Sequence, residues 1–383
     1  MSIDRVLHVY KDIYPPVPGG IERHIDAIRQ ATPGWRHDVL VCAHGLRTVR
    51  RDTPYGIETH VGQFGRLLST PLAPMFPRLL RQERRGALVH LHMPNPTGEA
   101  SVLVARRGGP LVASYHCDIF RQRALLPFYR PLVVACLRAA DAVAVGSSAL
   151  AATSPLIRAA DVPTTIVPYG VDVERWAPGT ASQQVIADLR ARYGAEHVLA
   201  VGRLVAYKGF DRLVRLSHRL TLPLVIAGDG PQRGQLEALI ERAGVADRVH
   251  LVGRVSDDRL AAHLAAAAVF VMPSINRAES FGLATLEAQA AGLALVATDV
   301  GTGTGEAFAP GTSGLLVPAD DDDALVAALN ELAAAPDRRR AMGEAGRRRV
   351  AERNSLAALG RALEELYAAA RARWRHSSSR LPA

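Results

Sequence analysis

Two carboxylates, Glu279 and Glu287, stand eight residues apart in the stretch MPSINRAESFGLATLEAQAAG, residues 272–292. The apolar run VFVMP leads into this stretch, and the alternating Leu/Ala/Glu pattern near its end predicts a helix that stops at Gly292. Glu279 would then lie in the loop just before the helix, and Glu287 inside the helix.

Between the two acids, the helix start is itself a candidate anion site. The amides of Phe281, Gly282 and Leu283 would have no partner within the helix, and the positive end of the helix dipole stabilises an anion such as phosphate. A strand, a loop acid, an anion-binding helix start and a second acid together suggest a site for a sugar phosphate.

Two cations could complete this site. Arg203 and Lys208 flank a loop that follows the apolar run VLAVGR and enters a helix. A guanidinium can fork onto phosphate oxygens while an ammonium acts as a point charge, so the pair suits a diphosphate. Only two of the 46 basic residues are lysines, which also favours a role for Lys208, although a solvated basic loop is the plain alternative.

The first half of the chain offers a second group of candidates. Gly19 and Gly20 follow an apolar run and precede a helix, where glycine lets a ligand approach the backbone, unless this is an ordinary flexible loop. His116 would lie at or just beyond another strand end, with Asp118 on the same face if the strand continues. We discount Cys117 as a nucleophile because neighbouring residues of a strand point in opposite directions.

Several patterns resemble other sites but fit them poorly. AGDGPQRG and VGTGTGE lack the order of a dinucleotide fingerprint, although Gly228 and Asp229 could line a base pocket. The acidic run 320–323 precedes an amphipathic helix, so we interpret it as a helix cap and not as a metal site. Three further histidines read as core or rim residues with no metal-site spacing: His8, His90 and His92.

The elements that would position these residues repeat in two sets. Short Val/Leu/Ile-rich runs alternate with helical stretches, which is typical of buried parallel strands in doubly wound α/β domains. Pro168–Gly170 and the segment 176–179 suggest a hinge. We therefore predict Rossmann-like domains at 1–172 and 173–352, an amphipathic helix at 353–375 and a disordered tail at 376–383.

Composition narrows the function classes. The net charge is +9, of which residues 1–170 carry +8, so an anionic membrane face or a phosphorylated ligand is conceivable. We expect no nucleic-acid binding, because no binding module is recognisable and aromatic residues are only 5%. No secretory signal or membrane span is recognisable, and three unpatterned cysteines favour a reducing cytoplasm, with peripheral contact at the inner membrane face left open.

An ordered series of segments makes the chain similar to family 4 glycosyltransferases of the GT-B fold. The series is PPVPGGIERH, YHCDI, GVDVERWAP, GRLVAYKGFDRL, IAGDGP and the E-x7-E from Glu279 to Glu287, and it spans nearly the whole chain. The resemblance implies two Rossmann-like domains facing across a cleft and a last helix that crosses back to the first domain. It also implies a nucleotide-sugar donor in the second domain and an acceptor (glycan, lipid-linked or small molecule) in the first.

The resemblance further implies hexosyl transfer with retention and without a metal or other cofactor. It suggests catalytic roles for His116, Glu279, Arg203 and Lys208. It suggests donor contacts for Gly19, Gly20, Arg203, Lys208, Gly228, Asp229, Gly253, Arg254, Glu279, Phe281, Gly282, Leu283 and Glu287.

One segment departs from the family pattern. Many relatives carry a Gly-Gly-Ile/Leu-Pro-Glu type segment where this chain reads DVGTGTGEAF. The variant is closer to polysaccharide and O-antigen transferases, which favours GDP-mannose or a UDP-hexose as donor. A GT-B sugar-nucleotide epimerase and an anionic-membrane or nucleic-acid binding protein remain as alternatives.

Overall fold

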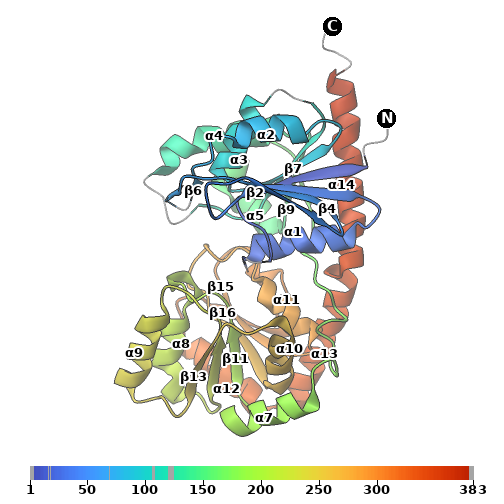
Figure 1. The fold of residues 1–383 in the computed structure, drawn as a ribbon. Coiled ribbons are helices and arrows are strands. Elements are labelled where there is room, and N and C mark those ends of the chain that lie inside the picture. The colour runs from blue at the N-terminus through green and yellow to red at the C-terminus, as the bar shows by residue number, and fades with distance from the viewer. Residues whose placement is uncertain are drawn as a thin grey trace. The chain divides into compact units, whose positions relative to one another are not determined.

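The computed structural model describes residues 4–15, 17, 19–68, 70–105, 108–119 and 125–378 (Figure 1). The chain divides into two compact units. Unit 1 comprises Met1–Gly170 and Leu356–Ala383, and unit 2 comprises Val171–Ser355. The chain therefore leaves unit 1 once and returns to it with its last helix.

Unit 1 is built on an eight-stranded sheet with the order β10-β9-β8-β7-β1-β2-β4-β3. All neighbours are parallel except β3 and β4, which pair antiparallel. The strands of this unit are β1 Arg5–Val9, β2 Arg36–Cys42, β3 Val49–Thr53, β4 Gly56–Val61, β7 Leu88–Met93, β8 Leu111–Tyr115, β9 Ala142–Val145 and β10 Thr164–Ile166, with β5 Arg66–Leu67 and β6 Thr70–Pro71 as a separate two-stranded hairpin. Its helices are α1 Gly20–Ala31, α2 Phe76–Glu83, α3 Pro96–Val104, α4 Leu126–Ala139, α5 Ser148–Thr153, α6 Pro155–Ala160 and α14 Leu356–Ser378.

The order of strands in unit 1 reverses between β1 and β7, so connections run outward in both directions from that point. In an open parallel sheet, ligands bind beside the carboxyl ends of the strands at such a reversal. The loop after β1 carries the predicted Gly19 and Gly20, which therefore stand at the expected edge.

Helix α14 packs on unit 1 through the apolar stripe that its sequence predicts. Leu359, Leu363, Leu366, Tyr367 and Ala370 are each at most 1% exposed and join the core formed with α1 and the sheet. The helix continues through Ser378, beyond its predicted end, and the rest of the predicted tail lies outside the described residues.

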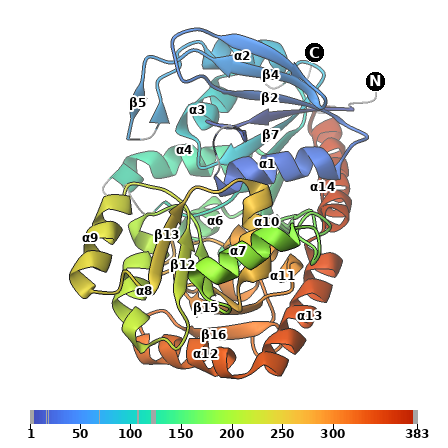
Figure 2. The same ribbon diagram turned by 60° about the horizontal axis from the view of Figure 1, so that its bottom comes forward.

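Unit 2 has a six-stranded, fully parallel sheet with the order β13-β12-β11-β14-β15-β16 (Figure 2). The strand order reverses between β11 and β14. The strands are β11 Val198–Val201, β12 Leu224–Ala227, β13 Val249–Gly253, β14 Val269–Met272, β15 Ala294–Asp299 and β16 Gly314–Pro318. The helices are α7 Gln183–Tyr193, α8 Phe210–Leu216, α9 Arg233–Ala243, α10 Asp257–Ala266, α11 Leu283–Ala290, α12 Asp322–Ala334 and α13 Pro336–Arg353, with short turns η2 Ala206–Lys208, η3 Ser217–Arg219 and η4 Gly303–Gly305.

No helix among the described residues is long and apolar enough to cross a lipid bilayer.

Candidate functional site

The reversal point of the unit 2 sheet holds an ion pair between two predicted site residues. Lys208 lies in the turn η2 after β11, and Glu279 lies in the loop after β14. The Lys208 Nζ is 2.5 Å from Oε2 of Glu279. The strand order therefore brings together an acid and a base that are 71 positions apart in the sequence, at the edge where a doubly wound sheet binds its ligand.

A close backbone approach holds these two loops together. The Ile275 amide donates to the Tyr207 carbonyl at 2.9 Å. Gly209, with φ +70°, sits so near the second loop that a Cβ there would meet the Pro273 carbonyl oxygen at 2.2 Å. Only glycine fits this position without strain, so the sequence YKGF fixes where Lys208 points.

Glu279 is enclosed by hydrogen-bond donors. It is 6% exposed, and its Oε2 accepts from the Ser274 hydroxyl at 3.0 Å as well as from Lys208. The Thr302 hydroxyl donates to the Glu279 carbonyl at 2.7 Å. Burial alone would lower the pKa of Lys208, but the adjacent Glu279 carboxylate outweighs burial and raises that pKa. The ammonium is thus charged near neutral pH, and two of its three N–H groups remain available for a ligand.

Unpaired arginines stand along the same edge of unit 2. Arg203 follows β11 and Arg254 follows β13, and both are exposed. Within the described ranges, neither guanidinium makes a hydrogen bond or an ion pair. Two free guanidinium groups therefore stand at the same edge as the Lys208 ammonium and can meet an anionic ligand.

Two glycines lie at the ends of strands β12 and β13 along this edge. Gly228, with φ +148°, lies against the backbone of Gly202, where a Cβ would meet the carbonyl oxygen at 1.9 Å. Next to it, Asp229 is exposed and accepts from the Gly230 amide at 2.7 Å. Gly253, φ +74°, ends β13 directly before Arg254.

The predicted helix start is the N-terminus of α11 in the structure. Gly282 is the N-cap of α11 in the left-handed region, φ +85°, and a Cβ there would meet Met272 Sδ at 2.2 Å. The Thr285 amide and hydroxyl both donate to the Gly282 carbonyl, at 2.9 and 2.7 Å. Phe281 is buried beside this cap, Leu283 is the first helical residue, and Glu287 is half-buried in the second turn.

The segment that departs from the family pattern packs on the same loop. The Gly303 amide donates to the Ser280 carbonyl at 2.9 Å, next to the bond between Thr302 and Glu279. Arg277 also donates to the Gly301 carbonyl. Ser274 and Thr302 were missed as site residues, because hydroxyl residues in loops carry no spacing signal that separates them from ordinary turns.

The acidic run before α12 is a cap, as predicted. Asp321 accepts from the Ala324 amide at 2.8 Å, which is an N-cap hydrogen bond. Arg212 pairs with Asp322, and Arg219 pairs with Asp323 at 2.6 Å. These charges are therefore already compensated by the helix and by neighbouring arginines.

In unit 1, the glycine loop meets its helix as predicted. Gly20 is the first residue of α1 and Gly19 is its N-cap. The Glu22 carboxylate lies over this turn, where a Cβ on Gly19 would meet Glu22 Oε2 at 2.0 Å. An acid thus already stands at this helix start, so a phosphate here would have to displace the carboxylate or approach beside it.

His116 lies just beyond β8, as predicted, but at the end of a buried file of imidazoles. His37, His8, His92 and His116 are joined in sequence by ring nitrogen contacts of 3.0, 3.1 and 3.1 Å. The Tyr169 hydroxyl closes the file at 3.2 Å from His116 Nδ1. Both ring nitrogens of His116 are therefore engaged, and the residue is only 4% exposed.

The direction of hydrogen bonding in this file follows from its far end. The Thr32 hydroxyl donates to the Ile28 carbonyl, so toward His37 Nε2 it can only accept, as can the Thr32 carbonyl at 3.0 Å. His37 therefore carries its proton on Nε2. Since each neutral imidazole has one donor and one acceptor, we infer that every member is the Nε2–H tautomer and that Tyr169 donates to His116.

Burial keeps the file neutral. It lowers the pKa of His37 to about 4 and of His90 to about 3, and the pKa of His116 falls well below its ordinary value for the same reason. His116 is therefore neutral with both ring nitrogens engaged, which favours a positioning role over proton transfer.

Strand register explains why three of the histidines form a cluster that the sequence did not reveal. His8 of β1 stands opposite His90 of β7, and His92 follows on the same face. Nitrogens of these three lie within 4.8 Å of one another, as metal ligands would. All six nitrogens already have hydrogen-bond partners, among them Tyr367 and Ser114 for His90. The cluster is thus a satisfied polar core, as the core interpretation predicts.

Comparisons with known proteins place both units in one enzyme family. Residues 18–175 match the family described as Glycosyltransferase Family 4, and residues 183–349 match Glycosyl transferases group 1. The chain belongs to glycosyltransferase family 4. It is a glycosyltransferase of the GT-B fold, as its motifs predict.

Curated relatives and solved structures agree with this assignment. D-rhamnosyltransferase WbpZ of Pseudomonas aeruginosa is 31% identical over 88% of this chain and 89% of its own length. O-antigen chain mannosyltransferase C of Escherichia coli is 30% identical over 91% and 94%. Sucrose-phosphate synthase of Thermosynechococcus elongatus has the same fold, with a TM-score of 0.80 at 23% identity over 95% and 98% of the two chains. Anabaena HepE in complex with UDP gives a TM-score of 0.76 at 19% identity over 95% and 99%.

Proposed function

We propose that this glycosyltransferase moves a hexose, with retention of anomeric configuration, from a nucleoside-diphosphate sugar to a glycan, lipid-linked or small-molecule acceptor. The observation that carries the proposal is the Lys208–Glu279 pair at the strand reversal of unit 2. This pair lies at the edge where a doubly wound sheet binds a nucleotide.

The charges of this edge suit a diphosphate leaving group. Lys208 is held by one carboxylate oxygen and keeps two N–H groups, and Arg203 adds a guanidinium with no partner among the described residues. Fixed cations stabilise the negative charge that grows on the leaving diphosphate as the glycosidic bond breaks. They supply the electrostatic function that a divalent metal has in other transferases, so the proposed reaction needs no metal.

Glu279 has two roles in this proposal. Its Oε2 holds the Lys208 ammonium and the Ser274 hydroxyl, which orients the cation. Its Oε1 has no partner among the residues that the structure describes and is available to accept from a sugar hydroxyl. Glu287, half-buried in the second turn of α11, is proposed to contact the ribose.

Retention is proposed to proceed by departure and attack on the same face of the sugar. In that mechanism the leaving phosphate oxygen accepts the proton of the acceptor hydroxyl, so no side chain need act as a base. The burial and double engagement of His116 support this, because the imidazole has no free nitrogen for proton transfer. GDP-mannose and UDP-hexoses are the proposed donors, and a mannosyl- and a rhamnosyltransferase are among the relatives.

Thermal-shift screening with GDP and UDP identifies the base first, because a ligand that binds only the folded protein raises its stability. The protein is then incubated with GDP-mannose, UDP-glucose and UDP-galactose, with and without EDTA. We expect release of the matching nucleoside diphosphate in both conditions by slow transfer of the hexose to water. The free hexose that forms first should keep the donor's anomeric configuration in proton NMR recorded before mutarotation. Inversion of configuration or complete loss of release in EDTA would overturn the respective part of the proposal.

A further inference from the structure

Asp118 lies in the loop at the carboxyl end of β8, two positions after His116. In the sheet of unit 1, β8 neighbours β7, and Tyr115 at the end of β8 is in register with Met93 at the end of β7. The His116 amide donates to the Met93 carbonyl at 3.0 Å, which ties the start of the loop to that strand. Asp118 is therefore a half-buried carboxylate at the edge where a doubly wound sheet binds its ligand.

Two buried hydroxyl groups fix one oxygen of this carboxylate. The Tyr115 hydroxyl donates to Asp118 Oδ1 at 2.8 Å, and the Ser154 hydroxyl donates to the same oxygen at 2.6 Å. Tyr115 and Ser154 are both 0% exposed. Burial, together with the neighbouring Asp118 carboxylate, raises the pKa of Tyr115, so this phenol keeps its proton. The Ser154 oxygen also accepts from the Ile157 amide as the N-cap of α6, which leaves the hydroxyl proton for Asp118.

The second oxygen of the carboxylate is left for a ligand. Within the described ranges, Asp118 Oδ2 makes no hydrogen bond and no ion pair. His116 cannot offer a ring nitrogen in its place, because His92 and Tyr169 engage both. A carboxylate oxygen accepts and does not donate, so a ligand that binds here must bring an O–H or N–H group.

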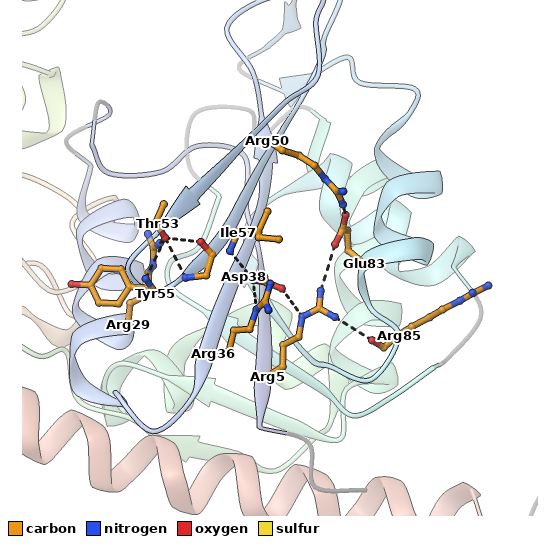
Figure 3. Close-up of polar contacts among 11 residues, drawn as sticks. Arg5, Arg29, Arg36, Asp38, Arg50, Thr53, Tyr55, Ile57, Glu83 and Arg85 are labelled. Atoms are coloured by element: carbon orange, nitrogen blue, oxygen red, sulfur yellow. Dashed lines mark hydrogen bonds and ion pairs between the residues drawn. The ribbon is translucent and has the colours of Figure 1, made fainter.

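A carboxylate that serves only as an anchor looks different in the same unit. Arg5 and Arg36 bind the two oxygens of Asp38, at 2.5 and 3.1 Å, and the Ile57 amide donates to it at 2.7 Å (Figure 3). Both oxygens of Asp38 are thus occupied and its charge is compensated. Asp118 has two neutral partners on one oxygen, and no cation pairs with it among the described residues.

This arrangement selects the chemistry of the ligand. Hydroxyl groups form charge-assisted hydrogen bonds with a carboxylate, which are stronger than bonds between neutral groups. A phosphate or carboxylate group would be repelled by the uncompensated charge of Asp118. A neutral sugar, which carries several hydroxyl groups and no charge, therefore suits this position.

We propose that Asp118 is an acceptor-binding residue, whose Oδ2 accepts a hydrogen bond from a hydroxyl group of a neutral sugar at the end of the acceptor. Tyr115 and Ser154 hold the carboxylate in place for this contact. The inference rests on the proposed function, since it names the chemical class of that reaction's acceptor. Asp118 binds the sugar and is not the base, because the leaving phosphate takes the proton of the attacking hydroxyl.

Saturation-transfer NMR with simple glycosides tests the contact without a donor. The probes are methyl α-mannoside, methyl α-glucoside and methyl α-galactoside, and we expect the wild type to bind at least one of them. Asp118→Asn should weaken that binding by about 10-fold or more, because a hydrogen bond to a charged group is lost. Its amide oxygen can still accept from Tyr115 and Ser154, so the thermal unfolding midpoint should stay close to that of the wild type. Equal binding by both proteins, or no binding of any probe by the wild type, would overturn the proposal.

Asp52→Asn is the matched control. Asp52 is exposed on β3, at the far end of the sheet order from β8, and its side chain has no partner among the described residues. This variant removes the same charge from unit 1 and should bind the glycoside as the wild type does. A similar loss in both variants would mean that the net charge of unit 1, and not the Asp118 contact, controls binding.

Monodeoxy analogues of the bound glycoside test the same hydrogen bond from the side of the ligand, and this test holds even if the Asp118 variant folds poorly. Removal of one particular hydroxyl should weaken binding to the wild type by about 10-fold, and should add little to the loss already present in Asp118→Asn. Independent, additive losses would show that Asp118 does not contact the sugar.

Transfer assays separate this inference from the proposed reaction. With the glycoside as acceptor, Asp118→Asn should raise the acceptor KM more than it lowers kcat, because the contact holds the acceptor before and during reaction. Nucleoside diphosphate release by the wild type, with unchanged sugar binding in Asp118→Asn, would refute the role of Asp118 alone. Sugar binding that depends on Asp118, without release from any donor, would refute the proposed reaction and leave a sugar-binding site.

Discussion

The titratable side chains at the strand-order reversals of the two sheets differ in charge: they are neutral in unit 1 and charged in unit 2. In unit 1, imidazoles from β1, β2 and β7 form hydrogen bonds to one another in the buried interior and stay neutral. In unit 2, a charged lysine pairs with a buried glutamate, and exposed arginines flank the pair. Both units have the same doubly wound plan, so the contrast comes from the side chains and not from the fold.

Under the proposed function, the contrast corresponds to two different tasks. A neutral, internally satisfied file gives a rigid edge that adds no charge, which suits the binding of an uncharged acceptor hydroxyl. Fixed cations that can meet an anion suit a diphosphate, whose charge grows during reaction.

Mild acid should destabilise unit 1 before unit 2. Burial lowers the pKa of His24 to about 3, of His37 to about 4 and of His90 to about 3. A folded-state pKa below the unfolded value of about 6.5 means that the stabilisation is present above about pH 6.5 and is lost as the pH falls. At about pH 5.5 each of these three costs on the order of 1 kcal/mol, so that together they cost a few kcal/mol.

Hydrogen-exchange mass spectrometry between about pH 7.5 and 5 can follow the units separately. We expect peptides from β1, β2 and β7 to lose protection first. Unit 2 carries fewer such groups among its described residues, with the pKa of His263 lowered to about 4 and those of His197 and His250 lowered to a smaller extent by burial. Simultaneous opening of both units, or earlier opening of unit 2, would contradict the proposed difference.

Substitution of Lys208 tests the charged side of the comparison. Lys208→Ala should lower kcat/KM by about 10²- to 10³-fold, because the growing charge on the leaving diphosphate loses a fixed cation and Glu279 loses its partner. Arg215→Ala, which removes a surface ion pair with Asp211, is the matched control and should have no effect. A Lys208→Ala variant with wild-type nucleotide release would show that the diphosphate binds elsewhere.

The sequence predicts the strands of unit 2 more completely than those of unit 1, because burial makes a strand recognisable as an apolar run. The parallel strands of unit 2 coincide with short Val/Leu/Ile-rich runs of the sequence, because fully buried strands are continuous apolar runs. The antiparallel β3–β4 pair was missed, since VRRDTPYGIETHV is too polar to resemble a buried strand and much of it is exposed.

The site residues likewise divide into those that the sequence predicted and those that it did not. Lys208 and Glu279 were predicted from loop positions next to strand ends, and the structure joins them. The imidazole file could not be predicted, because it depends on the register of β1 against β7 and on which strands are neighbours. Tyr169, which closes the file, had been interpreted only as part of the hinge. A residue's role can be predicted from the sequence when it depends only on the residue's position at the end of one strand. It cannot be predicted when it depends on which strands pair and in which register.

The smallest predicted effect is the loss of the Tyr169 hydroxyl at the end of the imidazole file. Tyr169→Phe removes the hydroxyl that donates to His116 Nδ1, at a cost of about 1 kcal/mol in the free energy of unfolding. Chemical denaturation of the variant and the wild type measures this difference. Tyr55→Phe is the control, since the Tyr55 hydroxyl has no hydrogen bond among the described residues.

The tautomers distinguish a directed file from loose packing. Because the acceptors of Thr32 fix the proton of His37 at the opposite end, His8, His92 and His116 should keep the proton on Nε2 in wild type and in Tyr169→Phe, as read from imidazole ¹⁵N shifts. A switch of the file to Nδ1–H in the variant would mean that Tyr169, and not Thr32, sets its direction. His116 would then be coupled to the segment that leads out of unit 1, and its positioning would depend on that segment instead of on the core.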